Sequence, residues 1–378
     1  MERSLPPYAR NTIKLLGLIL LIYALRKLDH VLLPVLFAAL LSFLLVPIVR
    51  QLEKWRWPRW LAALLSILGL VGVLTGVIWI IASQLADLSG DWAIIKQKLI
   101  LQYDTLRGWL NRRFGIAAPN RQALLASTLD SLREQGSSIF GSAATITTGV
   151  IANLALGVVY MFCFLYYRDH FRQFMFRVVK ADQRSGVLHV VNKIEDVTQS
   201  YLAGLLTVIV IVALMNITGL MLLNVRYAVF FGTLASLLAV IPFIGMTIGA
   251  SLPVIYTLVE TGSPLRALAV LAMFLFVQFL EGNFITPGIT GPKVSINPLA
   301  AIFGLILGGE LWGLPGMILS IPLVAVVKVV FDVTPGMEPY GFLLGDVTDG
   351  IVSNARTPGV PPPTWWTRLK LALRQTRK

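Results

Sequence analysis

The feature that most limits the fold of this chain is a series of apolar segments that recurs along nearly its whole length. A helix needs about 20 largely apolar residues to cross a bilayer. The segments that approach this character are 13–25, 31–49, 60–82, 146–167, 202–223, 228–259, 265–280 and 311–331. The sequence therefore predicts an all-α polytopic membrane protein with about eight membrane-embedded helical elements.

The composition excludes an ordinary soluble domain. Only 13% of the 378 residues are charged and 56% are hydrophobic, whereas soluble domains carry roughly 25% charged residues. The net charge of +13 falls mainly between and after the apolar segments, which favours contact with lipid headgroups and predicts no nucleic-acid partner. A single cysteine, Cys163, excludes an intrachain disulfide and a thiolate metal site.

Clusters of basic residues indicate the orientation in the membrane. They follow the second segment, the fourth segment and the last segment, and basic clusters mark the cytoplasmic side. We therefore expect both the N-terminus and the C-terminus to be cytoplasmic. The clusters are Arg50, Lys54, Arg56 and Arg59; Arg168, Arg172, Arg177, Lys180 and Arg184; and Arg368, Lys370, Arg374, Arg377 and Lys378.

Two stretches are too polar to lie in the membrane. Apolar residues recur at helical spacing from Leu85 to Leu99, so the first stretch is expected to begin as an amphipathic helix outside the cell or in the periplasm. The second stretch ends in a similar stripe, from Val187 to Val197, that predicts a helix on the cytoplasmic face. The expected organisation is N-terminal membrane helices at 1–82, a helical insert at 83–142, a membrane core at 143–335 with the cytoplasmic helix at 168–200, and a cytoplasmic tail at 336–378.

The second half of the chain interrupts its own apolar segments twice. Segment 228–259 exceeds one crossing and contains the sequence Ile-Pro-Phe-Ile-Gly at 241–245, so it is either a kinked helix or a hairpin that enters and leaves on one side. The second interruption, 281–309, is rich in glycine and proline, and its apolar part at 299–307 is too short to span. It predicts a re-entrant hairpin followed by a last helix. Paired broken segments are the best sequence indication of a binding site in a transporter.

The ordered motifs in these interruptions resemble the autoinducer-2 exporter family of bacterial membrane proteins. The resemblance covers about the last 150 residues in order and spacing, and nearly the whole chain in its plan of spans. It rests on residues 225–228, 241–245, 281–283, 286–287, 291, 298, 308–309, 313, 316 and 322. The chain departs from the family pattern at Met246 and Gly288, which leaves the solute open.

The resemblance implies a homo-oligomer, with a pentamer as one form, in the bacterial inner membrane and without a bound cofactor. Some relatives look like exporters of autoinducer-2, and others look like sodium/proton antiporters. The implied partners are a small polar solute, Na⁺ or H⁺, and the lipid bilayer.

Polar groups near the interruptions are the candidate site. Glu281 ends an apolar segment, where a carboxylate suggests ion or proton handling or else marks the interface at a helix end. Amide side chains within spans bind a solute or pack helices together. The expected pathway residues are Asn216, Pro242, Gly245, Gln278, Glu281, Gly282, Asn283, Thr286 and Pro287.

Three functions compete at this point. Export of a small polar metabolite such as autoinducer-2 leads, sodium/proton antiport through Glu281 is the first alternative, and a non-transporting scaffold for envelope enzymes is the second. An enzyme is not expected, because His30, His170 and His189 form no metal-ligand pair and a Ser-centred GxSxG motif is missing from the sequence.

Overall fold

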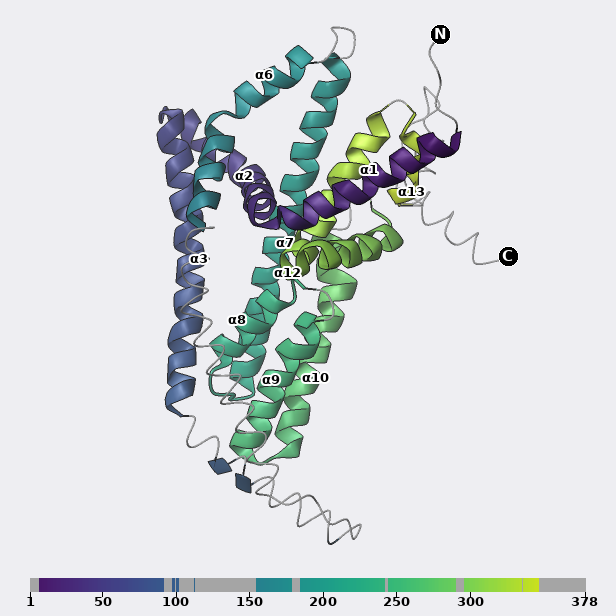
Figure 1. Ribbon diagram of the computed structural model, residues 1–378. Coiled ribbons are helices and arrows are strands. Elements are labelled where there is room, and N and C mark those ends of the chain that lie inside the picture. Colours follow the sequence, from purple (N-terminus) through teal and green to yellow (C-terminus); the bar gives the residue numbers. More distant parts are fainter. Residues whose placement is uncertain are drawn as a thin grey trace, which may run out of the picture.

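The protein is described by a computed structural model (Figure 1) that covers residues 7–91, 97–98, 100–101, 112, 154–178, 184–241, 244–289, 296–334 and 336–346. Within these ranges the regular structure is helical, without strands. Five helices are long and apolar enough to cross a membrane, and two shorter apolar helices lie at Leu154–Tyr166 and Ala228–Leu238. The predicted all-α polytopic membrane fold is confirmed.

The helices run as follows in chain order. The N-terminal ones are α1 (Pro7–Lys27), α2 (Asp29–Lys54) and α3 (Arg59–Gly90), and after the insert come α6 (Arg168–Val178) and α7 (Arg184–Leu222). The remaining ones are α8 (Ala228–Leu238), α9 (Ile244–Thr261), α10 (Pro264–Leu280), the π-helix η2 (Glu281–Ile285), α11 (Thr286–Ile289), α12 (Pro298–Val333) and α13 (Glu338–Leu344). Most of the predicted insert, 83–142, lies outside the described residues.

Helix α7 differs from the expected arrangement. The apolar stripe around Val187–Val197 was predicted to form a separate helix on the membrane surface, but it continues into the fifth apolar segment. No proline interrupts the 39 residues of α7, so nothing in the sequence ends the helix between these two parts. The result is one long helix that reaches well beyond the packed core at the α6 end (Figure 1).

Residues 228–259 contain two helices, α8 and α9, that lie back along each other as a hairpin. The two helices pack directly on each other. A methyl group added to Gly249 would lie 2.9 Å from the Cα of Ala235, and one added to Gly245 would overlap the backbone of Ala239. Such close pairing holds only if the two helices run back along each other. That this hairpin enters and leaves the membrane on one side stays a prediction.

Helix α12 is also bent back on itself. Trp312 and Gly313 leave the helical conformation, and Gly313 adopts a φ of 64° that favours glycine. On either side of this bend, a methyl group on Gly308 or Gly316 would overlap the partner arm. The arms 298–311 and 314–333 therefore pack closely, and Trp312 at the tip donates to the backbone carbonyl of Leu25 in α1 at 2.9 Å.

This bend corrects the predicted boundaries of the second interruption. The short apolar stretch 299–307 belongs to the first arm of α12, and the predicted last helix is its second arm. The bend lies at Trp312 and Gly313, and Gly308 lies where the two arms meet.

The beginning and the end of α12 meet at α13. Asn297 caps α12 by accepting from the Ala300 amide at 2.7 Å and donates to the carbonyl of Gly345 at 3.1 Å. At the other end of α12, Gly341 of α13 lies against Asp332. The first part of the predicted tail therefore closes the α12 hairpin, and residues 347–378 lie outside the described part.

Candidate functional site

The carboxylate of Glu281 lies where α10 widens into a π-turn. Residues Glu281–Ile285 form this turn between α10 and α11, and the amide of Thr286 donates to the carbonyl of Glu281 across it. Such π-turns inside helices are frequent at functional sites. At Glu281, where the sequence predicted an interruption, the helix changes locally from α to π and continues into α11.

The π-turn brings Thr286 onto the face of Glu281. Residues five apart in an α-helix point about 140° away from each other, but here the Thr286 hydroxyl donates to Glu281 Oε1 at 2.7 Å. Gln278, one turn earlier, donates through Nε2 to Glu281 Oε2 at 2.7 Å. Both carboxylate oxygens are thus held by neutral donors from the same helical segment.

No cation neutralises Glu281 among the described residues. Lysine, arginine and histidine nitrogens in the described ranges all lie farther than 4.0 Å from its carboxylate, whereas Glu53 and Glu195 form ion pairs by that criterion. A carboxylate held by neutral groups keeps its capacity to bind a proton, a cation or a hydroxyl-rich solute.

Glu281 borders two cavities. The smaller one holds about 20 Å³ and is also lined by Asn216, Gly245 and Gln278, which is enough for about one water molecule. The larger one holds about 440 Å³, a volume in the range of small-molecule sites. The same side chain therefore borders a solute-sized chamber and a cavity for about one water molecule.

The larger cavity lies between the two hairpins. Its walls come from α7, from the end of α8 and the turn that follows, from the π-turn and α11, and from both arms of α12. In Figure 1 the open end of the α8–α9 hairpin lies towards the α9–α10 turn, whereas the open end of α12 lies beside α13 nearer the opposite end. The lining residues are Tyr201, Leu205, Val208, Ile209, Val212, Ser236, Ala239, Val240, Glu281, Thr286, Ile296, Ala301 and Ile321.

Asn216 joins α7 to α8 beside the smaller cavity. It is 3% exposed, and its Nδ2 donates to the Ser236 hydroxyl at 3.2 Å. Ser236 in turn donates to the carbonyl of Gly232 at 2.7 Å. The Oδ1 atom of Asn216 is buried without a hydrogen-bond partner among the described residues, and a buried, unpaired acceptor costs free energy that a bound donor would recover.

The other predicted pathway residues divide into two groups. Gly245 is buried at the smaller cavity, beside the turn between α8 and α9. Gly282, Asn283 and Pro287 are exposed, and Asn283 donates to the carbonyl of Phe279 on its own helix at 2.8 Å. These three residues therefore do not line the cavities at Glu281. Pro242 lies outside the described residues.

Sequence reasoning missed Ser236 and Tyr201, which also line the larger cavity. A serine inside an apolar helix most often bonds the carbonyl four residues earlier, as Ser236 does, so its second role had no distinctive pattern. Tyr201 stands where the polar part of α7 changes to the apolar part, and only the fold shows which side it faces.

The described residues contain no group of three or more histidine, cysteine or acidic side chains that could hold a metal ion. The site within these ranges is one carboxylate with hydroxyl and amide groups. This arrangement can bind and release a proton, a monovalent cation or a polar solute by exchanging hydrogen bonds.

Comparison with known proteins agrees with this arrangement. The family model of AI-2E family transporters matches residues 13–336. YueF of Bacillus subtilis, a candidate transport protein, is 29% identical over 311 residues, covering 79% of this chain and 82% of its own. The AI-2 transport protein TqsA of Escherichia coli is 28% identical over 341 residues, covering 87% of this chain and 94% of its own.

A third relative, MT0215 of Mycobacterium tuberculosis, is also a candidate transport protein and is 28% identical over 366 residues, covering 92% of this chain. The family match spans both hairpins, the π-turn and the cavities at Glu281. With its apolar helices, the chain is a multi-pass membrane protein that belongs to the AI-2E family of transporters.

Proposed function

We propose that this protein is a secondary transporter that moves a small polar solute through the larger cavity, past Glu281. The observation that carries the proposal is the position of Glu281, which borders both cavities and is held only by Gln278 and Thr286 in the described structure. Neutral donors fix the carboxylate without cancelling its charge, so a passing solute can replace one of them.

The two hairpins give the cavity a way to open alternately. Broken helices that meet near the middle of the membrane are typical of secondary transporters, where one element moves against a fixed scaffold. The end of α8 and both arms of the α12 hairpin line the larger cavity. Movement of one hairpin relative to α7 would expose the cavity on one side at a time. Such a motion is the one that a transporter needs, so it favours a transporter over an enzyme.

Autoinducer-2 is the first solute to test, with export as the direction. TqsA, which is similar over most of this chain, is named an AI-2 transport protein. The polar groups of the cavity, from Tyr201, Ser236, Thr286 and Glu281, can each accept or donate to hydroxyl groups. The mostly apolar remainder of the wall would favour a compact solute over a strongly charged one.

Sodium/proton antiport is the second candidate. Glu281 borders a cavity that holds about one water molecule, and a carboxylate at such a position is a natural carrier of a proton or a cation. In this case the larger cavity would serve as the water-filled entrance for the ion rather than as the solute chamber.

The orientation proposed for this activity places the α6 end in the cytoplasm of a bacterial cell, with the protein in the inner membrane. Arg50 and Arg59 lie at the same end as Arg168 and Arg172, where they pair with residues of α6 and α7. The positive-inside rule then makes this end cytoplasmic. Both termini would follow on that side.

Flux in proteoliposomes tests the function. The full-length protein is reconstituted, and efflux of autoinducer-2 and of other small polyols is compared with efflux from empty vesicles. The expected result is solute flux above the empty-vesicle rate without any sodium gradient. Sodium-dependent movement of protons without solute flux would favour antiport, and the absence of both would overturn transport through this site.

A further inference from the structure

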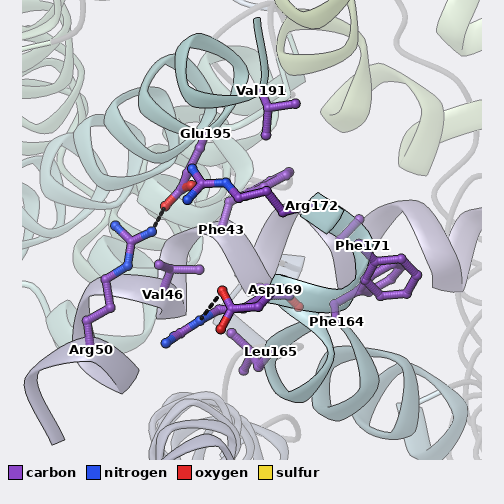
Figure 2. A pocket seen from close by; sticks show the side chains of 13 residues that line it. Phe43, Val46, Arg50, Phe164, Leu165, Asp169, Phe171, Arg172, Val191 and Glu195 are labelled. Carbon is purple, nitrogen blue, oxygen red and sulfur yellow. Dashed lines mark ion pairs between the residues drawn. The ribbon is translucent and has the colours of Figure 1, made fainter. Parts of the chain in front are cut away.

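A third cavity opens at the α6 end, away from Glu281. It holds about 270 Å³ and lies between α2, the helix 154–166, α6 and the first part of α7 (Figure 2). We call it the arginine pocket, after Arg50, Arg168 and Arg172 in its lining. None of its lining residues borders the two cavities at Glu281, so it is a separate site.

The inner wall of the arginine pocket is apolar. It is formed mainly by side chains from α2 and from the helix 154–166, which pack together in a hydrophobic cluster that includes Leu165, with one residue each from α6 and α7. Most of the labelled side chains in Figure 2 belong to this wall. The apolar lining residues are Ala39, Phe43, Val46, Phe164, Leu165, Phe171 and Val191.

The charged residues of the pocket do not cancel one another. Three arginines face two carboxylates, those of Asp169 and Glu195. Glu195 is paired with Arg50 at 2.7 Å, and Asp169 is paired at 2.6 Å with Arg59, which lies outside the lining. Both carboxylates are therefore already engaged.

Two arginines retain unused capacity. Arg172 donates to the neutral side chain of Asn192 and forms no ion pair within 4.0 Å in the described part of the chain. Arg168 is paired with Glu53 and, through Nε at 3.9 Å, with Asp169, yet its Nη1 atom is buried without a hydrogen-bond partner among the described residues. A buried guanidinium nitrogen without an acceptor is costly, and an anion supplies the missing acceptor.

We propose that the arginine pocket binds an anionic phospholipid, with its phosphate between Arg168 and Arg172 and part of one acyl chain on the apolar wall. Arginine forks match phosphate oxygens well. The volume is too small for a whole lipid, so the remainder would extend over the outer surface. There Tyr167, Phe171 and Phe174 are exposed, as aromatic residues at a membrane–water interface are.

The apolar wall distinguishes a lipid from a free anion. Inorganic phosphate would bind the two arginines but would leave the apolar wall around Phe43 and Phe164 without a bound group. A lipid satisfies both parts at once, and its acyl portion is supplied by the membrane that surrounds these helices. Neutral lipid would fill the wall but carry no net charge to complement the arginines.

Thermal stability of the full-length protein in a neutral detergent tests the proposal. Short-chain phosphatidylglycerol, short-chain phosphatidylcholine and inorganic phosphate are titrated separately, and the midpoint of each Tm increase gives an apparent affinity. Only phosphatidylglycerol is expected to raise the Tm at low concentration. Native mass spectrometry of the same samples should show the anionic lipid retained on the protein.

Three variants locate the binding. Arg172→Gln is expected to weaken phosphatidylglycerol about tenfold, because it removes a charged donor and keeps an amide beside Asn192. Arg266→Gln, which removes the same charge from an exposed residue of α10, should leave the affinity unchanged. Ala39→Leu should reduce lipid binding by filling the wall while every arginine remains.

The outcomes separate the sources of the anion. Equal stabilisation by phosphatidylcholine, or an equal loss in Arg266→Gln and Arg172→Gln, would overturn the proposal. Full stabilisation by inorganic phosphate alone would overturn it too, because the pocket would then be a simple anion site. If Arg172→Gln lowers the yield of folded protein, Ala39→Leu alone decides between these results.

Discussion

The Glu281 site and the arginine pocket both hold carboxylates between helices, but they hold them in opposite ways. Glu281 accepts hydrogen bonds from a glutamine and a threonine, both at 2.7 Å. Glu53 and Glu195 are paired with arginines instead. The first arrangement leaves the charge of the carboxylate available to a new partner, and the second uses it to tie helices together.

This difference matches the position of each region in the fold. At the α6 end, ion pairs link α2 to the start of α6 and to the first part of α7, which ties three helices together. At Glu281 the donors come from the same helical segment as the carboxylate. That cluster can therefore travel as a unit or change partners without breaking a link between helices.

The largest expected effect comes from Glu281→Gln, which keeps the shape of the side chain and removes its charge. Solute flux per reconstituted molecule should fall about tenfold to hundredfold, because hydrogen bonds to a charged group are the strong ones. The Tm should change little, since no inter-helix ion pair is lost. Glu310→Gln, an exposed carboxylate on the first arm of α12, serves as the control in the same flux assay.

If Glu281→Gln and Glu310→Gln retain equal flux, the site assignment is wrong. A variant that loses both flux and folding would make Glu281 a structural residue like Glu53. Either result would remove the distinction between the two regions.

The reverse pattern is expected for Glu53→Gln. This change removes the nearer of the two carboxylates paired with Arg168, a mostly buried side chain of which 18% is exposed, and leaves only Asp169 at 3.9 Å. The free energy of unfolding should fall by about 2 kcal/mol, while flux per folded molecule stays the same. Denaturation in detergent, followed by the loss of helical signal, measures the first quantity.

Asp169→Asn provides the matched comparison for Glu53→Gln. Its side chain is 50% exposed and pairs with Arg59 at 2.6 Å, and exposed ion pairs contribute little. The expected loss is below about 1 kcal/mol. An equal loss in both variants would show that burial does not set the strength of this network.

A smaller effect is expected from Thr286→Val, which removes one of the two donors to Glu281. Flux should fall about fivefold, as the loss of roughly 1 kcal/mol implies. Thr286→Ser keeps the hydroxyl and should restore most of the flux. If serine and valine behave alike, the hydroxyl is not the group that matters, and the π-turn does not act by bringing it to Glu281.

The smallest effect is expected at the opposite end, in the loop between α7 and α8. Tyr227 donates to Asp91 at 2.6 Å, and burial together with this bond raises its pKa to about 12. The folded state thus favours the protonated phenol. The resulting stability is complete below about pH 10 and is lost as pH rises through 12.

Tyr227→Phe should therefore cost below about 1 kcal/mol at neutral pH and remove this part of the dependence of the Tm on pH between 10 and 12. Asp91 keeps its partner Arg226 at 2.6 Å, which is why the loss is small. An unchanged pH profile in Tyr227→Phe would assign the titration to another group.

The sequence predicted the parts of the fold that depend on length and composition alone. Apolar segments of membrane length were found because only lipid suits so apolar a surface, and the proline and glycine residues at 241–245 marked the break between α8 and α9. The bend of α12 at Gly313 could not be located, because glycines serve two purposes there. Gly313 makes the bend, whereas Gly308 and Gly316 allow the arms to approach.

Only part of the candidate site could be predicted from the sequence. Gln278 and Glu281 are three residues apart, so helical geometry places them together. The contact of Thr286 with Glu281 depends on the π-turn, and no pattern in the sequence predicts this turn. The bond from Asn216 to Ser236 joins two helices, and the spacing within one segment contains no information about its neighbour.

Access to the larger cavity from water tests the central claim most directly. A cysteine at Ala301, which lines the cavity, is introduced in a background where Cys163 is replaced by alanine. Leu299→Cys on the same arm, at a residue 75% exposed, is the control. A polar thiol reagent should label Ala301→Cys. The transported solute should slow this labelling, and the labelled protein should lose its flux. If the solute does not slow the labelling of Ala301→Cys, and if labelling leaves the flux unchanged, transport past Glu281 is contradicted.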